Sequence, residues 1–453
     1  MTIGMIKTAL YKQIKNNFGD PSLKEFQEFN SIKSGDDLAR FREKALKKLI
    51  LHSYNNVPYY RKVMGEIGLT DGNTVDLSKF NDLPILKKEI IKKEEENLIS
   101  KDYHERKWLY NYSGGSTGKP IRVIQDYSYT KHSIASNYYY YKNMLNIDEP
   151  YVKKILLWGS PSDFSKSGGL KSKILDWFTN KVLLNSYRMT PEDMDEYIKT
   201  INSYQPELIR GYSGSLYELA KHAKNRNIDI YSPPVLVGSA ESLNTQMRNL
   251  IEEVFRTKIH DFYGSREINN LAGECKEGMM HILPANIIEI VDENNNPVSP
   301  GQTGKVIVTN LFNYSMPLIR YQIGDMATLG PLECECGNPL PTLEKIDGRL
   351  FESFVLDDGT IISGEFFVQL IGVYCNKGFI DQFQVIQRDY NNLKVLVVSE
   401  SLSKGEIDDI NEKIRIFMGQ DCEIEWEFVR EIPPTTTGKF LYTKSLVLDD
   451  TQN

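Results

Sequence analysis

The sequence predicts an α/β protein with a large N-terminal domain and a small α+β domain at its C-terminal end. The chain has 453 residues, which is too long for a single hydrophobic core. Short apolar runs alternate with amphipathic helical segments, a rhythm typical of strands buried under helices. From Ser353 onward, shorter strands and helices follow one another. We therefore expect a large domain over residues 1–348 and a small one over residues 349–453, with a hinge at Gly348–Glu352.

Two helices are predicted in the first third of the chain. Apolar positions recur at helical spacing from Leu38 to Ser53, and the pattern ends before the helix-breaking pair Val57-Pro58. A second helix is expected from Tyr127 to Met144. Its four consecutive tyrosines, Tyr138–Tyr141, present rings to several faces of the helix. They therefore either pack in the core or form one wall of a substrate pocket.

The middle of the chain predicts a layered α/β region followed by a β-rich region. Lys154–Trp158 and Pro234–Val237 are expected to be strands, and Leu243–Phe255 a helix, as in βαβ units. Asn286–Val291 and Gly304–Thr309 flank a turn-forming segment and predict a β-hairpin region. In the small domain we expect two strands and one helix, at residues 394–398, 423–428 and 406–418 respectively.

Composition and charge exclude several classes of protein. The formal net charge of −7 argues against nucleic acid as a main partner, since that role needs a basic surface. No apolar run reaches the roughly 18–20 residues of a membrane span, and the first residues lack the pattern of a signal peptide. Five cysteines, an odd number, indicate a reducing compartment rather than a disulfide scaffold. The expected location is the cytoplasm.

The run from Tyr112 to Pro120 concentrates hydroxyls, glycines and one lysine between two strand-like stretches. Such a loop can close backbone N–H groups and hydroxyls around phosphate oxygens. It is not a Walker loop, because Ser113 stands where that pattern needs glycine and Pro120 where it needs Ser or Thr. Taken alone, the segment leaves open a plain flexible loop.

Further motifs follow the loop in a fixed order. They are Tyr263-Gly264-Ser265-Arg266-Glu267, Arg320-Tyr321-Gln322-Ile323-Gly324-Asp325, Gly348-Arg349 and Thr435-Thr436-Thr437-Gly438-Lys439. In this order and spacing, the set resembles the motifs of the adenylate-forming superfamily of acyl-CoA synthetases, nonribosomal adenylation domains and luciferases. Residues 55–61 and 83–88 narrow the resemblance to the phenylacetate–CoA ligase-like branch, which also holds the capsular polysaccharide biosynthesis ligases. The resemblance runs from about Leu46 to Lys444.

The resemblance implies an ATP-dependent, AMP-forming carboxylate ligase with a mobile small domain. Such an enzyme converts a carboxylic acid to an acyl-adenylate and passes the acyl group to an acceptor. Coenzyme A is the first expectation for that acceptor, because the branch is named for it. Transfer to an amine or hydroxyl, as in a capsule-type ligase, is the alternative, and an inactive nucleotide-binding homologue is a third. The identity of the acid, the presence of a carrier protein and the oligomeric state, including a homodimer, stay open.

The same resemblance assigns the phosphate tail of ATP to the first loop. A catalyst of adenylation must hold this charged tail and neutralise charge at the α-phosphate. The polar residues expected to hold the β- and γ-phosphates are Ser113, Ser116, Thr117 and Lys119, and the residues that shape the backbone are Gly114, Gly115 and Gly118.

The resemblance also implies that the second motif, residues 263–267, binds the adenine base and Mg²⁺. Tyr263 is expected to stack on adenine, next to Gly264 and Ser265 in the same turn. Glu267 is expected to bind Mg²⁺, a hard cation that requires oxygen ligands. The loop Ser239-Ala240-Glu241 resembles the adenine-side loop of the family, with small residues that admit the edge of the base.

The remaining family positions concern the ribose and the catalytic cation. Asp325 is expected to accept hydrogen bonds from both ribose hydroxyls, and Arg349 to contact ribose or phosphate. The pivot between the domains is unsettled, and Glu352 is the candidate for it. Lys439 is expected to be the catalytic cation, which reaches the carboxylate and α-phosphate when the small domain closes and withdraws when it rotates.

Four soft ligands predict a second metal site. Cys275, His281, Cys334 and Cys336 form the donor set of a closed structural Zn²⁺ site, and the glycine after Cys336 suits a tight metal-binding turn. Similar Cys/His placement occurs in relatives of this branch. Buried free thiols are the alternative, because C-x-C is a less typical spacing than C-x-x-C. The other two cysteines, Cys375 and Cys422, are expected in the core.

The residues of the acyl-substrate pocket are the site residues that the sequence predicts least well. Its residues are scattered in this superfamily, so no single motif predicts them. The candidate pocket residues are Tyr138, Trp158, Tyr212 and Ser239.

Overall fold

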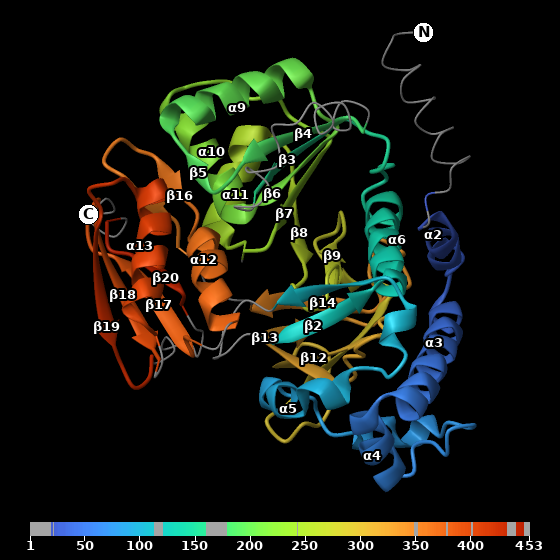
Figure 1. Cartoon of the computed structure of the whole chain (residues 1–453). Helices are drawn as coiled ribbons and strands as arrows, with labels where there is room; N and C mark the ends of the chain where they lie inside the picture. Colours follow the sequence, from blue (N-terminus) through green and yellow to red (C-terminus); the bar gives the residue numbers. More distant parts are fainter. Residues whose placement is uncertain are drawn as a thin grey trace.

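The computed structural model describes residues 20, 22–112, 121–159, 179–241, 243–347, 352–376, 379–399, 402–432 and 441–447. Figure 1 shows a helical N-terminal region beside a large central sheet, with a separate C-terminal α+β unit on the opposite side. The predicted α/β class is confirmed. Among the described helices, none combines the length and the apolar character that crossing a membrane requires.

The N-terminal region consists of short helices around two longer ones. Helix α3 begins after Ser34, whose hydroxyl accepts a hydrogen bond from the amide of Asp37 at 3.1 Å, and α4 begins with Pro58. The predicted helix at 38–53 is therefore confirmed with wider bounds. The helices are α2 (Leu23–Asn30), α3 (Gly35–Asn56), α4 (Pro58–Glu66), η1 (Leu77–Asp82), α5 (Lys88–Glu94), η2 (Glu95–Leu98) and η3 (Tyr103–Glu105).

The central sheet has eleven strands in the order β11-β12-β13-β14-β10-β9-β8-β7-β6-β3-β4. From β4 to β8 neighbouring strands are parallel, and from β8 to β11 they are antiparallel. The parallel strands are β3 (Lys154–Trp158), β4 (Lys181–Asn185), β6 (Leu208–Tyr212), β7 (Val235–Ser239) and β8 (Ile259–Tyr263). The antiparallel strands are β9 (Ala272–Glu274), β10 (Met280–Ile282), β11 (Asn286–Val291), β12 (Thr303–Asn310), β13 (Tyr321–Leu329) and β14 (Thr342–Asp347).

Helices connect the parallel strands, as expected of βαβ units. Helix α9 (Pro191–Tyr204) precedes β6, α10 (Ser213–Asn225) joins β6 to β7, and α11 (Thr245–Phe255) joins β7 to β8. One face of these strands forms an apolar core with the three helices, in which Ile209, Leu236 and Ile259 are buried. The predicted strands at 154–158 and 234–237, the helix at 243–255 and the β-hairpin β11–β12 are all confirmed.

The buried residue before helix α6 (Tyr127–Asn143) connects this helix to a distant segment of the chain. Its N-cap, Asp126, is fully buried and accepts from the amide of Tyr129 at 2.9 Å. The other carboxylate oxygen of Asp126 accepts from the amides of Tyr314 and Ser315 at 2.8 and 2.9 Å. All four tyrosines of the run are buried; Tyr139, Tyr140 and Tyr141 pack in the core, and Tyr138 lines a cavity. One carboxylate thus joins α6 to a segment almost two hundred residues away.

A two-stranded ribbon precedes α6. Its antiparallel strands are β1 (Trp108–Tyr112) and β2 (Arg122–Asp126), and Tyr112 lies opposite Arg122. The predicted phosphate loop connects these strands, and its residues 113–120 lie outside the described part of the chain.

The C-terminal unit has its own four-stranded sheet, in the order β19-β18-β17-β20. Helix α13 begins with a capping box, in which Ser403 and Glu406 hydrogen-bond to each other's backbone amides. The predicted strands and helix of this unit are confirmed. Its elements are α12 (Gly364–Asn376), β17 (Gln382–Gln387), β18 (Asn392–Val398), α13 (Lys404–Met418), β19 (Glu423–Phe428) and β20 (Thr443–Ser445).

The segment that joins the two regions pairs with the large one. Strand β16 (Ile361–Ile362) lies between β15 (Phe354–Val355) and β5 (Arg188–Met189) in a small antiparallel sheet. The core of the C-terminal unit also includes Tyr187 and Tyr212, from the large region. The domain boundary at 348/349 stays a prediction. The residues on its two sides contact each other through the pairing of β16 with β5 and through the shared apolar core.

Candidate functional site

Two of the predicted nucleotide residues meet between the parallel and antiparallel halves of the sheet. Tyr263 ends β8 and Asp325 lies in β13. The Tyr263 hydroxyl donates a hydrogen bond to Oδ2 of Asp325 at 2.7 Å. The ring that we expect to stack on adenine and the carboxylate that we expect to bind ribose are thus adjacent, although 62 residues separate them in sequence.

Glu267 lies in a buried polar cluster close to this pair. Its side chain is 1% exposed, and its Oε1 accepts from the hydroxyl of Tyr321 at 3.1 Å. The ammonium of Lys88, itself 7% exposed, is 3.8 Å from the same oxygen. The turn that carries Glu267 is closed by Ser265, whose hydroxyl accepts from the amide of Ile268 at 3.0 Å. The carboxylate is therefore held at a fixed position beside a cation.

The ribbon β1–β2 holds the backbone of the same turn. Asn111 donates its side-chain amide to the carbonyl of Arg266 at 2.8 Å. Gln125 donates to the carbonyls of Arg266 and Glu267 at 2.9 and 3.0 Å. Asn111 and Gln125 lie in the strands on either side of residues 113–120, so both of these strands are held next to the turn of the predicted magnesium ligand.

The predicted adenine-side loop follows strand β7. The Ser239 hydroxyl donates to the carbonyl of Phe262 at 3.0 Å, and Ala240 adopts a positive φ of 68°. The carboxylate of Glu241 accepts from the amide of Gly214 at 2.6 Å, at the N-terminus of α10. Glu241 therefore stabilises that helix terminus, where a negative charge is favoured, and its contact with a nucleotide stays a prediction.

Several predicted residues are not among those that the structure describes. They are the loop residues Ser113, Gly114, Gly115, Ser116, Thr117, Gly118 and Lys119, together with Arg349 and Lys439. Glu352, the candidate pivot, is described and binds β20. Its Oε2 accepts from the amide of Ser445 at 2.7 Å, and its own amide donates to the Thr443 hydroxyl at 2.9 Å.

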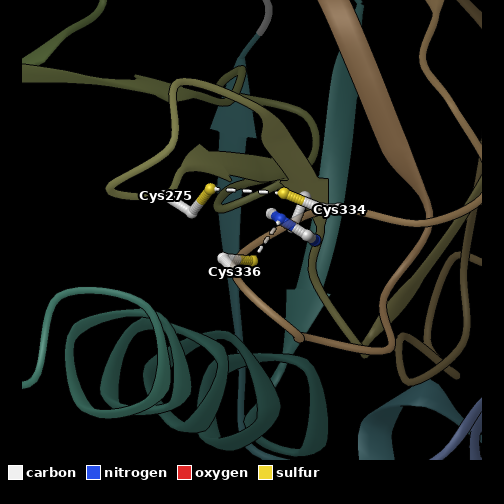
Figure 2. Close-up of side chains that lie close together, drawn as sticks. Cys275, Cys334 and Cys336 are labelled. Atoms are coloured by element: carbon white, nitrogen blue, oxygen red, sulfur yellow. Dashed lines mark hydrogen bonds between the residues drawn. The ribbon is translucent and has the colours of Figure 1, made fainter.

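The four predicted soft ligands converge at the far end of α6. The ligand atoms of Cys275, His281, Cys334 and Cys336 all lie within 4.8 Å of one another. The sulfurs of Cys275 and Cys334 are 3.8 Å apart, and Cys336 Sγ is 3.2 Å from His281 Nε2. Figure 2 shows the three cysteine sulfurs turned toward one another. Two tight turns present the thiols, closed by hydrogen bonds from the amides of Gly278 and Gly337 to the carbonyls of Cys275 and Cys334.

The protonation states of the histidine and cysteines in this cluster favour a bound cation. Nδ1 of His281 lies 3.0 Å from the carbonyl oxygen of Leu340, so Nδ1 carries the proton and Nε2 presents a lone pair to the thiols. Burial opposes ionisation of Cys275, yet hydrogen bonds with His281 and nearby backbone amides lower the pKa of its thiol. Burial raises the pKa of Cys336 to about 12. A second thiolate would therefore need a positive charge among the sulfurs.

Of the remaining cysteines, Cys422 is buried as expected. The side chain of Cys375 lies outside the described part of the chain.

Sequence reasoning missed three residues of the site. Lys88 is the second lysine of segment 83–88, and nothing in that segment predicts that its ammonium is buried. Gln125 is an ordinary strand residue in the sequence. Arg210 lies in β6 beside the predicted pocket residues Trp158 and Tyr212, whose rings are 4.3 Å apart. A charged residue inside an otherwise apolar strand was the signal available for Arg210.

The known proteins with similar sequences include CapK and phenylacetate-coenzyme A ligases. The family described as the CapK C-terminal domain matches residues 354–445. Protein CapK of Staphylococcus aureus is 25% identical over 430 residues, which cover 91% of this chain and 90% of that protein. Phenylacetate-coenzyme A ligase of Thermus thermophilus is 25% identical over 352 residues, which cover 73% of each chain. The Escherichia coli protein of the same name is also 25% identical, and the match covers 73% of this chain and 74% of that one.

Solved structures give the same fold. A structure of 2-hydroxyisobutyryl-CoA ligase in complex with 2-HIB-AMP and CoA has a TM-score of 0.56 at 15% identity, covering 92% of this chain and 90% of that chain. An open conformation of that ligase has a TM-score of 0.54 at 16% identity, covering 88% and 90%. This likeness confirms the fold class, with its large sheet and small C-terminal domain.

Proposed function

Because the chain belongs to the adenylate-forming ligase superfamily, in the branch of phenylacetate–CoA ligases and CapK, we propose that it is an ATP-dependent, AMP-forming carboxylate ligase. In the first half-reaction a carboxylate oxygen attacks the α-phosphate of ATP and pyrophosphate leaves, which gives an acyl-adenylate. In the second, the acyl group passes to an acceptor and AMP is released. The observations that carry the proposal are the contact of Tyr263 with Asp325 and the hydrogen bonds that hold the Glu267 turn to the two strands flanking residues 113–120.

Each described residue has a defined part in this reaction. Tyr263 offers its ring to adenine, and its hydrogen bond orients the Asp325 carboxylate toward the ribose hydroxyls. Ser239 and Ala240 border the base. Gln125 fixes the Glu267 turn against strand β2, which follows the proposed phosphate-binding residues in the chain. Ser116, Lys119, Arg349 and Lys439 complete the site in the proposal, on the strength of their motifs.

Magnesium is the cation expected with ATP, and Glu267 fits it by chemistry. An ionised, buried carboxylate is a suitable oxygen ligand, and the cation would neutralise phosphate charge. We propose Glu267 as its protein ligand. Lys88 would then supply a fixed positive charge on the opposite side of the carboxylate.

The Cys/His cluster fits a structural zinc ion. Three sulfurs and one imidazole form a complete tetrahedral donor set, with no position left for water. Cys275 lies in the β9–β10 turn, His281 in β10, and Cys334 and Cys336 in the loop before β14, so the ion would join the β9–β10 hairpin to that loop. We propose zinc with a structural role and no part in the chemistry.

Coenzyme A is the proposed acyl acceptor, since several of the relatives are named phenylacetate-coenzyme A ligases. An amine or hydroxyl acceptor is the second candidate. It is favoured by the wider match with CapK, which covers 91% of this chain against 73% for the phenylacetate ligases.

The test of the proposed function is ATP–pyrophosphate exchange with a panel of aromatic, aliphatic and amino acids. We expect acid-dependent exchange that falls in Glu267→Gln and partly recovers at higher Mg²⁺. AMP release with coenzyme A or with amines would then identify the acceptor. Bound nucleotide without exchange for any acid would favour the inactive homologue.

A further inference from the structure

A cavity of about 410 Å³ lies between α6 and the parallel strands, and Arg210 lines it. Other parts of its wall come from Asn137 and Tyr138 of α6, from Lys154 and Lys181 at the first residues of β3 and β4, and from Glu149, which precedes β3. Tyr138 was already a predicted pocket residue. The cavity is therefore polar and partly cationic, although it lies against a face of a buried sheet.

The cavity begins beside the predicted adenylate site. Nη2 of Arg210 donates to the hydroxyl of Ser239 at 3.4 Å, so the guanidinium lies on the same face of the sheet as the predicted adenine-side loop. In the strand register Arg210 is opposite Leu156, and Lys154 starts β3 two residues earlier. Lys154 thus lies about 7 Å further along the sheet. An acid activated at the ends of β6 and β7 would extend past Arg210 into this space.

Among the described residues, aromatic rings and neutral hydrogen-bonding groups hold Arg210 in place. Its planar group lies over the rings of Phe262 and Trp158, at 4.5 and 5.5 Å from their centroids. Its hydrogen bonds go to neutral groups and are long, at 3.3 Å to Asn137 and 3.4 Å to Ser239. Within the described ranges no carboxylate forms an ion pair with it. Lys154, by contrast, is neutralised by Glu149 at 2.6 Å.

We propose that the acid substrate carries a second carboxylate, which Arg210 binds while the first is activated. This inference rests on the proposed function and names its substrate class as dicarboxylic acids. A partly buried guanidinium with no counter-charge is costly, and an incoming carboxylate would remove that cost. Carboxylate oxygens also form shorter and stronger bonds to guanidinium than the present neutral partners do. For a purely apolar acid, the same guanidinium would be a penalty.

The experiment compares short α,ω-dicarboxylates with monocarboxylates of equal carbon number in ATP–pyrophosphate exchange. The wild-type protein is expected to prefer the dicarboxylate of each pair. Arg210→Gln should lower the ratio of kcat/KM values within a pair on the order of 10²-fold, mostly through KM. Arg210→Lys should retain part of the preference. The matched control is Arg226→Gln on α10, an exposed arginine paired with Asp195, which should leave the ratio unchanged.

A second measurement needs no turnover. Dicarboxylates should raise the Tm of the wild-type protein and of Arg226→Gln, and the shift should be lost in Arg210→Gln. Equal use of both acids of each pair, or a preference that survives in Arg210→Gln, would overturn the inference while leaving the ligase function intact. If no acid supports exchange, the proposed function fails, and the Tm shifts alone then decide whether Arg210 binds a dicarboxylate.

Discussion

At the scale of single residues, the site depends on buried charges that compensate one another. Glu267 and Lys88 are both almost fully shielded from water, with side-chain exposures of 0% and 7%. A buried charge that loses its partner leaves the other uncompensated, which costs more than the pair itself contributes. The pair thus ties the stability of the fold to the position of the proposed magnesium ligand.

Lys88→Met should therefore lower the free energy of unfolding by about 3 kcal/mol. Combining it with Glu267→Gln should restore part of that loss, because the negative charge that faced the ammonium is then absent. Chemical unfolding of the two single variants and the double variant measures the coupling. The neighbouring, exposed Lys87→Met is the control and should change stability little. Strict additivity of the single changes would show that the two groups do not interact.

His132 predicts a pH dependence of stability. Its ring stacks on Phe312 at 3.5 Å, and burial lowers its pKa to about 4. Since the unfolded value is near 6.5, the unfolded chain takes up a proton that the folded chain does not. The contribution is complete above about pH 6.5 and is lost as the pH falls toward 4. By linkage it is worth about 3 kcal/mol.

Urea unfolding between pH 7 and pH 4.5 tests this contribution. The wild-type protein should lose more stability over this range than His132→Gln does. The exposed His104→Gln should follow the wild type. Parallel profiles for wild type and His132→Gln would exclude His132 as a titrating group in acid unfolding.

At the scale of elements, the Cys/His cluster joins the β9–β10 turn to the loop before β14. These strands are short, so their ladders contribute few hydrogen bonds. A bound ion would therefore supply much of the stability of this corner of the sheet.

Elemental analysis of protein purified without added metal should give about one zinc per chain. The double variant Cys334→Ser, Cys336→Ser should lose the metal and unfold at lower temperature. Cys422→Ser changes a buried thiol in the C-terminal unit and should keep the zinc. Metal-free wild-type protein with the same Tm as a zinc-loaded sample would leave the cluster as four ordinary residues.

At the scale of the whole molecule, the proposed reaction divides between two regions. The large region supplies Tyr263, Glu267 and Asp325, and the segment before the C-terminus supplies Lys439. The C-terminal unit shares its apolar core with Tyr187 and Tyr212 of the large region. A change of domain orientation between half-reactions would have to break or remodel this contact.

Lys439→Ala should reduce adenylate formation by at least about 10²-fold, the scale of one lost charge-stabilising group. Transfer from a chemically supplied acyl-adenylate should be retained much better. The two half-reactions are measured separately, by pyrophosphate exchange and by AMP release. Lys404→Ala, an exposed lysine on α13, is the control for both. An equal loss in both half-reactions would contradict the division of labour.

The sequence alone predicted the α/β class, several of the helices and strands, and candidate residues for a nucleotide site. These depend on local patterns: the periodicity behind α3 and α6, the turn residues between β11 and β12, and short motifs such as 263–267. The four zinc-type ligands were also predicted, because their side chains suit one kind of ion wherever they meet. Local physics is sufficient for such inferences, since each rests on neighbours within one element or on side-chain type.

Only the tertiary structure decided which distant residues share a site. Lys88 contacts Glu267, Gln125 holds the turn of Glu267, and Arg210 lines a cavity beside α6. The neighbouring residues in sequence predict none of these contacts, although a charge within an apolar strand marks Arg210 as unusual. Their roles arise from burial and strand register, which bring together segments up to about two hundred residues apart. The desolvation that makes the charges of Lys88 and Arg210 significant exists only once the sheet and its helices have closed around them.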